Sequence, residues 1–417
     1  MYNFLIKKFN GNQFYILLIS LLPVSLLIGT FVSEIIVFLL IFFFLYNLIL
    51  LKNFKFLINS IFLITVLIYF YLIFNLVIST NFELSFNRSV YFIRFPLLAM
   101  AIAYFIKKNN FNLKVIYKIW GITIAIIIFD LYFQNFFGFN LFGFKSPWPH
   151  RLSGFLGEEL KIAHLLIGFA AHVIIFNFVS TKNNKIFYLL LIIYLIILLL
   201  INERSNALKG ILIITFSYLF INEIKLKEKS FIIIIFISII FSIITFNDKV
   251  NQRFYNEIKK MNVENKKVSE YIKYSNYGPL YLSGYEVFKK YPYFGSGIKT
   301  FRKVCNDVDL EKYYINTPYE ILKIRKCNSH PHQIHMELLS ELGIFGYLLF
   351  LIFFSFLLIK AINVYIKNKN VNILCPILFV FSHYLPFLPS GSFFTNFSAI
   401  ILWINIGLIY SEILKYE

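Results

Sequence analysis

Apolar stretches of about twenty residues alternate with short polar connections along most of the chain. Hydrophobic runs of about 18–25 residues have the length that crosses a bilayer as an α-helix. Twelve such spans are predicted, at roughly 13–31, 32–51, 55–78, 90–106, 116–137, 160–180, 186–202, 207–222, 230–247, 336–359, 372–388 and 393–413. The pattern therefore predicts an all-α polytopic membrane protein with about twelve transmembrane helices.

One long polar stretch interrupts this pattern. We expect transmembrane helices 1–9 with short outer loops within residues 1–247, a large outer loop at 248–335, and helices 10–12 within 336–417. A loop of this length without a function of its own would be unusual. The loop between helices 9 and 10 is therefore the first place to look for a functional site.

Composition agrees with the spans. Of the 417 residues, 59% are hydrophobic and 15% are charged, whereas about a quarter of the residues of a soluble domain are charged. No small-residue cleavage site follows Lys7 and Lys8, so we expect the first apolar stretch to be a span and not a signal peptide. The net charge of +19 would suggest nucleic acid in a soluble protein. In a membrane protein it is first a matter of topology, and we expect no nucleic-acid partner.

Lysines mark every second connection between the spans. Basic residues collect in cytoplasmic loops, so these connections and both termini are predicted to be cytoplasmic. The outer segments are then 79–89, 138–159, 203–206 and 248–335. The lysines concerned are Lys7, Lys8, Lys52, Lys55, Lys107, Lys108, Lys114, Lys182, Lys185, Lys225, Lys227, Lys229, Lys360, Lys367, Lys369 and Lys415.

The long outer loop keeps a positive excess that topology does not require. It holds 16 Lys and Arg against 9 Asp and Glu. An anionic ligand or a membrane surface would account for this excess. Cys305 and Cys327 also lie in this loop, and a disulfide between them would stabilise the fold by about 3 kcal/mol; the alternative is two free thiols. No Cys/His zinc pattern is present in the sequence.

The end of the loop reads S-H-P-H-Q-I-H, so that three of the seven histidines, His330, His332 and His335, fall within six positions. Pro331 suits the first turn of a helix, which would put His332 among the free N–H groups of that turn. The positive helix end would keep this ring neutral and able to accept a proton. A phosphate site, a paired-histidine metal site with His335, and interfacial histidines without a role are the alternatives.

Two short outer segments carry arginines. Arg151 stands in W-P-H-R-L-S-G-F-L-G-E-E-L at 148–160, which ends on the acidic pair Glu158 and Glu159. Arg204 stands in the tight turn N-E-R-S-N, at the edge of the hydrocarbon region. A guanidinium there is costly and matches phosphate in shape and charge. The alternatives are simple helix stabilisation by the glutamates and a surface pair of Glu203 with Arg204.

The stretch Y-E-V-F-K-K-Y-P-Y-F-G-S-G-I-K-T-F-R-K-V-C at 285–305 predicts an amphipathic helix stopped by Pro292, followed by a glycine turn and basic residues that include Arg302. Two glycines alone are a weak phosphate-loop signal. Arg253, just after the ninth span, is a further basic residue on the outer side.

Together these segments resemble the O-antigen ligase and polymerase family of bacterial membrane glycosyltransferases. The hallmark of that family is His-Asn/Ser/Gln, nine residues and then Gly, which His332, Gln333 and Gly343 match. Pro292, Gly295, Gly297 and Phe301 match the preceding loop element, and R-x-S-G-x-x-G-x-E at 151–159 and E-R-S at 203–205 resemble two shorter motifs. F-R-x-x-C and C-x-S-H-P-H-Q resemble a branch in which both cysteines recur. The resemblance covers roughly residues 150–350.

The resemblance implies a GT-C-like fold in the bacterial inner membrane with its active face in the periplasm. It implies transfer of a glycan from an undecaprenyl-diphosphate carrier to an acceptor such as the lipid A core, with inversion and without metal or other cofactor. His332 corresponds to the general base and Arg204 to a diphosphate ligand, with Arg253, Arg302 and Arg151 as further diphosphate candidates. The supporting residues are His330, Gln333, His335 and Glu159.

Three other functions are weighed against an O-antigen ligase. An O-antigen polymerase would use the same chemistry on a carrier-linked acceptor, and a protein O-oligosaccharyltransferase would use a protein acceptor. A twelve-span transporter would need ionisable residues within its spans and repeat symmetry. Asp130 and His172 are the main residues of that kind, and the sequence shows no repeat.

Overall fold

The computed structural model describes residues 11–52, 54–108, 113–221, 223–254, 275, 277–314 and 326–416. Within these ranges every regular element is a helix. Among the described residues, eight helices are long and apolar enough to cross a membrane. The chain is therefore an all-helical polytopic membrane protein, while the number of twelve spans stays a prediction.

The eight long helical stretches are α3 (Thr30–Leu50), α4 (Ser60–Val77), the run Phe82–Lys107, α7 (Leu113–Phe137), α8 (Ile162–Thr181), α11 (Leu226–Phe246), α17 (Ile334–Asn368) and α19 (Asn396–Ile413). Shorter helices are α2 (Gly11–Ile28), α9 (Asn184–Leu200), α10 (Arg204–Leu219), α14 (Gly278–Lys290), α15 (Phe301–Val304) and α18 (Leu374–His383). The run Phe82–Lys107 contains α5 (Phe82–Val90), a 3₁₀ turn and α6 (Arg94–Lys108).

Asparagines cap several of these helices. The side chains of Asn59, Asn81 and Asn183 accept hydrogen bonds from the first-turn amides of α4, α5 and α9. Such caps satisfy donors that have no partner inside the helix. The cap at Asn81 corrects one prediction, because residues 82–89 of the expected outer loop 79–89 belong to helix α5.

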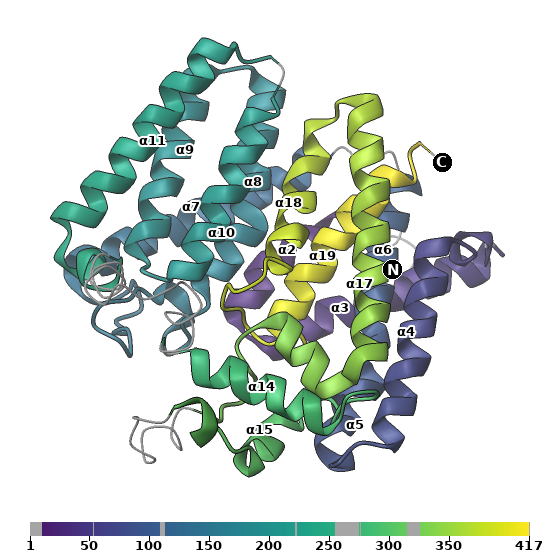
Figure 1. Cartoon of the computed structure of the whole chain (residues 1–417). Helices are drawn as coiled ribbons and strands as arrows, with labels where there is room; N and C mark the ends of the chain where they lie inside the picture. The colour runs from purple at the N-terminus through teal and green to yellow at the C-terminus, as the bar shows by residue number, and fades with distance from the viewer. Residues whose placement is uncertain are drawn as a thin grey trace.

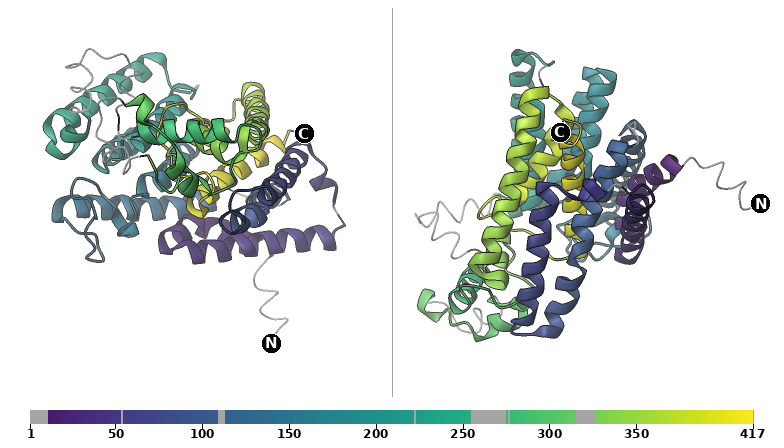
Figure 2. Two further views of the ribbon diagram at one scale, coloured as in Figure 1. Left: turned by 60° about the horizontal axis from the view of Figure 1, so that its bottom comes forward. Right: turned by 90° about the vertical axis from the view of Figure 1, so that its right-hand side faces the viewer.

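The two ends of the bundle differ. In Figure 1, α5, α14 and α15 lie together at the lower end. The right-hand view of Figure 2 shows α17 running from this end to the opposite one. Predicted outer segments therefore share one end of the molecule, which we call the loop end.

Helix α19 is the centre of the packing, with almost every side chain from Phe397 to Ile413 buried. Gly407 lets it approach α6 closely, because a Cβ there would lie 3.0 Å from the carbonyl oxygen of Ala99. Small residues at such crossings are typical of helix packing in membranes. Helix α11, in contrast, exposes Phe241 and Phe246, as expected for a surface that faces lipid.

Helix α17 is broken at Gly343, where φ is 66° and ψ −172°. The turn after α14 fills the break: the amide of Ile344 donates to the carbonyl of Pro292 at 2.9 Å, and the amide of Gly297 donates to the carbonyl of Glu341 at 2.9 Å. A Cβ on Gly343 or Gly295 would lie within 2.5 Å of backbone atoms of the other segment. The two glycine motifs of the sequence therefore meet, and they join the described part of the loop to α17.

Candidate functional site

The start of α17 differs from the prediction. The helix begins at Ile334, and Gln333 is its N-cap, with its side chain accepting a hydrogen bond from the amide of Met336 at 2.8 Å. His332 has a φ of 56° and lies before the helix, so the expectation that Pro331 and His332 form the first turn is wrong. A left-handed residue cannot continue into a right-handed helix, and the helix therefore starts two residues later.

Two of the three histidines are committed to the fold. His330 Nε2 donates to the carbonyl of Ser390 at 3.2 Å, and its Nδ1 faces the Ser329 hydroxyl at 3.0 Å. His335 Nε2 donates to the carbonyl of Tyr384 at 2.9 Å, and its Nδ1 faces the Tyr347 hydroxyl at 3.1 Å. A carbonyl only accepts, so Nε2 carries the proton in both rings.

His332 is the uncommitted histidine of the cluster. Its ring lies 4.1 Å from the ring of His330 and 5.6 Å from that of Tyr277, measured between centroids. Within the part of the chain that the structure describes, neither ring nitrogen of His332 has a hydrogen-bond partner. The expected pairing of His332 with His335 along one helix face is not formed, because His335 turns toward Tyr384.

The electrostatic setting keeps both loop histidines neutral. Burial, with the neighbouring His330, lowers the pKa of His332 to about 4. Burial, with the charge of Lys299, lowers the pKa of His330 to about 4. At neutral pH the His332 ring therefore has a free lone pair and is able to accept a proton.

Three of the segments that the sequence predicts to be outer meet at Asn202. Its side-chain amide donates to the carbonyl of His150 at 2.9 Å and to that of Lys249 at 2.8 Å. In addition, the amide of Leu152 donates to the carbonyl of Ile201 at 3.3 Å. This one side chain thus brings together the segments that carry Arg151, Arg204 and Arg253.

These three arginines form a group that we call the first arginine cluster. Arg151 lies 3.5 Å from the carboxylate of Glu203, and Arg204 Nη1 donates to the carbonyl of Arg253 at 3.2 Å. Burial lowers the pKa of Arg253, and the charges of Arg151 and Arg204 act in the same direction. Arg253 is also within electrostatic range of Tyr277, whose ring contacts His332. One carboxylate faces three guanidinium groups, so this side of His332 favours an anion.

Arg302 lies elsewhere. It is exposed on α15, and its Nη2 donates to the carbonyl of Ser329 at 3.4 Å, on the His330 side of the histidine pair. Glu159 is exposed and pairs with Lys161 at 2.9 Å, so it contacts none of the histidines. Cys305 and Cys327 are joined in a disulfide with a Cα–Cα distance of 5.4 Å.

A segment that the sequence analysis did not single out organises the site. We call residues 389–396, between α18 and α19, the anchor segment. Its carbonyl at Pro389 accepts from the Ser205 hydroxyl, and its amide at Ser390 donates to the carbonyl of His332 at 2.8 Å. At its far end, the side chain of Asn396 accepts from Arg88 and, at 3.1 Å, from Arg94. The segment therefore runs from the first arginine cluster, under the histidines, to α5 and α6.

A buried ion pair holds the anchor segment. Lys299 Nζ lies 3.8 Å from the carboxylate of Glu337, and the Ser392 hydroxyl bridges them by accepting from Lys299 and donating to Glu337. The amide of Phe393 donates to the second carboxylate oxygen at 2.9 Å. The side chains of Lys299 and Glu337 are 6% and 0% exposed. This pair connects the loop, α17 and the anchor segment.

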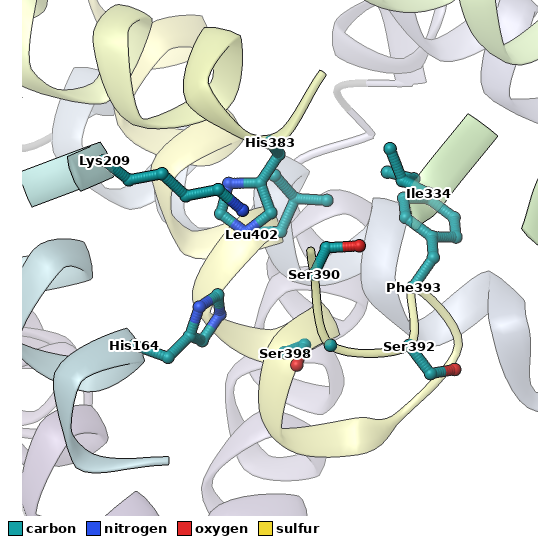
Figure 3. Close-up of a pocket in the computed structure, with 10 residues that line it drawn as sticks. His164, Lys209, Ile334, His383, Ser390, Ser392, Phe393, Ser398 and Leu402 are labelled. Atoms are coloured by element: carbon teal, nitrogen blue, oxygen red, sulfur yellow. The ribbon is translucent and has the colours of Figure 1, made fainter. Parts of the chain in front are cut away.

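A small cavity lies beside the anchor segment (Figure 3). Its volume is about 10 Å³, and its walls include His164, Lys209, His383 and Ser390. The Nε2 atoms of both histidines and the Ser390 hydroxyl are buried and, within the described residues, have no hydrogen-bond partner. The sequence analysis missed these residues, although their ionisable side chains within apolar spans were the signal that could have found them.

The alternative of a transporter depended on Asp130 and His172, and both side chains form contacts within the fold. Asp130 accepts from the amide of Leu141 at 2.8 Å, and His172 Nε2 contacts the side chain of Asn405 at 2.7 Å. Within the described residues, no group of three or more His, Cys, Asp or Glu side chains is arranged to hold a metal ion. The site that remains is one neutral imidazole beside a group of cations.

Comparison with known proteins gives one finding. Residues 162–351 match the family model described as O-antigen ligase, a stretch that runs from the start of α8 to the middle of α17 and includes His332 and Gly343. No curated protein matches the chain. The family is one of membrane glycosyltransferases of the ligase or polymerase type, whose partners are a lipid-linked glycan and a glycan acceptor. The match over residues 162–351 supports the O-antigen ligase family that the motifs predicted.

Proposed function

We propose that the protein transfers a glycan from undecaprenyl-diphosphate to an acceptor sugar such as the lipid A core, on the periplasmic face of the bacterial inner membrane. The observation that carries this proposal is the position of His332. Its ring is uncommitted, neutral and half-buried, and Tyr277 connects it to the first arginine cluster, whose cations favour a diphosphate.

The reaction is a single displacement at the anomeric carbon of the donor glycan. His332 accepts the proton of the acceptor hydroxyl while the hydroxyl oxygen forms its bond to the anomeric carbon. The bond from that carbon to the diphosphate oxygen breaks, and the electron pair leaves with the diphosphate. Attack opposite the leaving group inverts the anomeric centre. The proton then passes from His332 to water, which returns the ring to its neutral form.

The arginines act on the leaving group. Negative charge grows on the bridging oxygen as the bond breaks, and fixed cations in a partly buried site stabilise it more than water would. Arg204 and Arg253 are half-buried, and Glu203 neutralises part of the charge of Arg151. We therefore propose Arg204 and Arg253 as the principal diphosphate ligands, with Arg151 as a weaker one. This arrangement supports a metal-independent transfer.

Binding of the donor would also raise the pKa of His332. A pKa of about 4 makes His332 a weak base in the free protein. A diphosphate held by Arg204 and Arg253 brings negative charge close to the ring, and an opposite charge raises the pKa of an imidazole. Donor binding would thus move His332 toward the pH at which it has to work.

A matched pair of substitutions tests the proposal. His332→Gln removes the base but keeps a polar side chain, whereas His335→Gln makes the same change at a histidine that only ties α17 to Tyr384 and Tyr347. Loss of a general base lowers a rate about 10²–10⁴-fold. In a cell-free assay with undecaprenyl-diphosphate-linked glycan and lipid A core, in the presence of EDTA, we expect that loss for His332→Gln alone.

Donor binding is the second readout of this experiment. The His332→Gln protein should bind the lipid-linked donor as the unchanged protein does, because the arginines are intact. Full transfer by the His332→Gln protein would refute the role of the base. Absence of transfer by the unchanged protein to lipid A core, with transfer to a carrier-linked glycan instead, would make the protein a polymerase.

A further inference from the structure

A second group of cations lies on the other side of the histidine pair. Arg302 donates to the carbonyl of Ser329, next to His330, and is within electrostatic range of both His330 and Arg88. Helix α5 packs against the same loop, because the Ser85 hydroxyl donates to the carbonyl of Ile298 at 2.8 Å. Arg88 stands one turn after Ser85, and Arg302 stands four residues after Ile298. The two arginines therefore border the same seam between α5 and the loop.

The positive charge of this second group of cations is not balanced by carboxylates. Arg94 stands with Arg88 at the side chain of Asn396, and it forms an ion pair with Glu34 at 3.0 Å. Within the described residues, Glu34 is the carboxylate that pairs with this group, while Arg88 and Arg302 have no carboxylate partner. Arg302 is exposed and Arg88 is half-buried. Since Glu34 balances only the charge of Arg94, a ligand that approaches from the loop end would meet the two unbalanced guanidinium groups of Arg88 and Arg302.

The anchor segment limits the distance between the two arginine groups. Pro389 contacts Ser205, next to Arg204, and Asn396 contacts Arg88. Asn396 stands seven positions after Pro389, which places the two contacts at most about 23–25 Å apart even for an extended chain. Ser390, whose amide donates to the carbonyl of His332, lies between Pro389 and Asn396 along this segment. A donor diphosphate at the first cluster and an acceptor at Arg88 and Arg302 would thus approach the base from opposite sides.

We propose that Arg88 and Arg302 form an acceptor site that binds a phosphate or carboxylate group of the acceptor glycolipid. This inference rests on the proposed function and deepens it, because it states that the acceptor is anionic near its reacting sugar. A guanidinium provides two parallel donors to either group. The anion orients the acceptor hydroxyl toward His332, and it does not take part in bond making or breaking. Two sources carry this chemistry: an anionic sugar of lipid A core, or the diphosphate of a second carrier lipid.

The test uses two neighbouring residues of α15. Arg302→Gln removes the proposed ligand, and Lys303→Gln removes the same charge from an adjacent exposed side chain that has no place in the proposed site. The acceptors are phosphorylated lipid A core, the same core after phosphatase treatment, and undecaprenyl-diphosphate-linked glycan. Transfer is measured at saturating donor, and binding of each acceptor is measured separately without donor.

Arg302→Gln should raise KM for the phosphorylated core about tenfold, the effect of one charge-assisted hydrogen bond at a partly exposed site. It should not change KM for the donor, and it should have no effect on the phosphatase-treated core, whose KM is already raised in the unchanged protein. Lys303→Gln should leave all values within about twofold. If Arg302→Gln weakens only the carrier-linked acceptor, the anion is the second diphosphate.

Two results would overturn the inference. One is an unchanged KM of the Arg302→Gln protein for the phosphorylated core, with binding of the carrier-linked acceptor also unchanged. The other is an equal effect of Arg302→Gln and Lys303→Gln, which would indicate general charge attraction. Failure of the proposed function looks different, because transfer to every acceptor would then be absent while the binding measurement still decides whether Arg302 recognises an anion.

Discussion

Among the contacts that hold the site, the ion pair of Lys299 and Glu337 should be the one whose removal has the largest effect. The substitution Glu337→Gln keeps the size of the side chain but removes its charge. Glu337 holds the hydroxyl of Ser392 and the amide of Phe393, and its charge faces Lys299. Because both ionic side chains are almost completely buried, water cannot replace the lost interaction.

The magnitude follows from the geometry. Two unit charges 3.8 Å apart interact by about 4 kcal/mol at an effective dielectric constant of about 20. Removing one member of a buried pair usually costs about 3–5 kcal/mol, since the remaining charge stays buried without compensation. We expect Glu337→Gln to lower the free energy of unfolding by about that amount. Lys299→Met together with Glu337→Gln should recover part of the loss.

Unfolding in detergent, followed by circular dichroism, measures the stability of both proteins. Glu223→Gln is the matched control: Glu223, between α10 and α11, pairs with Lys182 at 2.7 Å, and the two side chains are 46% and 54% exposed. Such an exposed pair contributes about 0.2–1 kcal/mol. Transfer activity should fall with Glu337→Gln, because the anchor segment then no longer holds His330 and His332, and it should be normal with Glu223→Gln.

Double-mutant analysis gives the decisive comparison. The losses of stability caused by two substitutions add when the two sites are independent, whereas residues of one network deviate from this sum by an interaction energy. If the double variant is as unstable as the sum of the single variants, Lys299 and Glu337 do not interact and the reasoning is wrong. A loss of less than 1 kcal/mol for Glu337→Gln alone would refute it as well.

Two further predictions concern pH and the disulfide. Because the base has to be neutral, kcat/KM should fall as pH drops through about 4, the pKa of His332 in the free protein, and the corresponding fall of kcat should lie at higher pH, since the bound diphosphate raises that pKa; identical profiles for the His332→Gln protein would contradict this. Cys305→Ser should destabilise the protein by about 3 kcal/mol, as expected for a closed loop of this length, with Cys375→Ser, at a buried free thiol, as the comparison; equal stability with and without a reducing agent would contradict it.

The sequence was a good guide where chemistry depends on local spacing. Apolar runs of membrane length predicted the helical class, and the nine residues between Gln333 and Gly343 predicted the family that residues 162–351 match. That spacing has a structural explanation, because α17 is broken at Gly343 and the turn at Gly295 packs into the break. A motif of this kind can be recognised in the sequence because it runs from the residues that cap one helix to the break in the same helix.

The rest of the site depends on contacts between distant segments. The anchor segment has no charged residue of its own, and its backbone groups form the contacts with Ser205, His332 and Glu337. Likewise, Arg253 and Arg302 were equal candidates for the diphosphate in the sequence. Only the folded chain separates them, because Asn202 draws the Arg253 segment to Arg204, whereas Arg302 follows the loop toward α5.

The left-handed backbone of His332 has to be held in place by hydrogen bonds of the surrounding residues. A left-handed conformation costs an ordinary residue roughly 1–2 kcal/mol, and such strain persists only where the surroundings impose it. The amide of Ser390 holds the carbonyl of His332, Gln333 caps α17 directly after it, and His330 is fixed from both ring nitrogens. All of these contacts restrain His332 without using its own ring. The proposed base is thereby positioned through its backbone, and the unprotonated nitrogen of its neutral ring remains free to accept a proton.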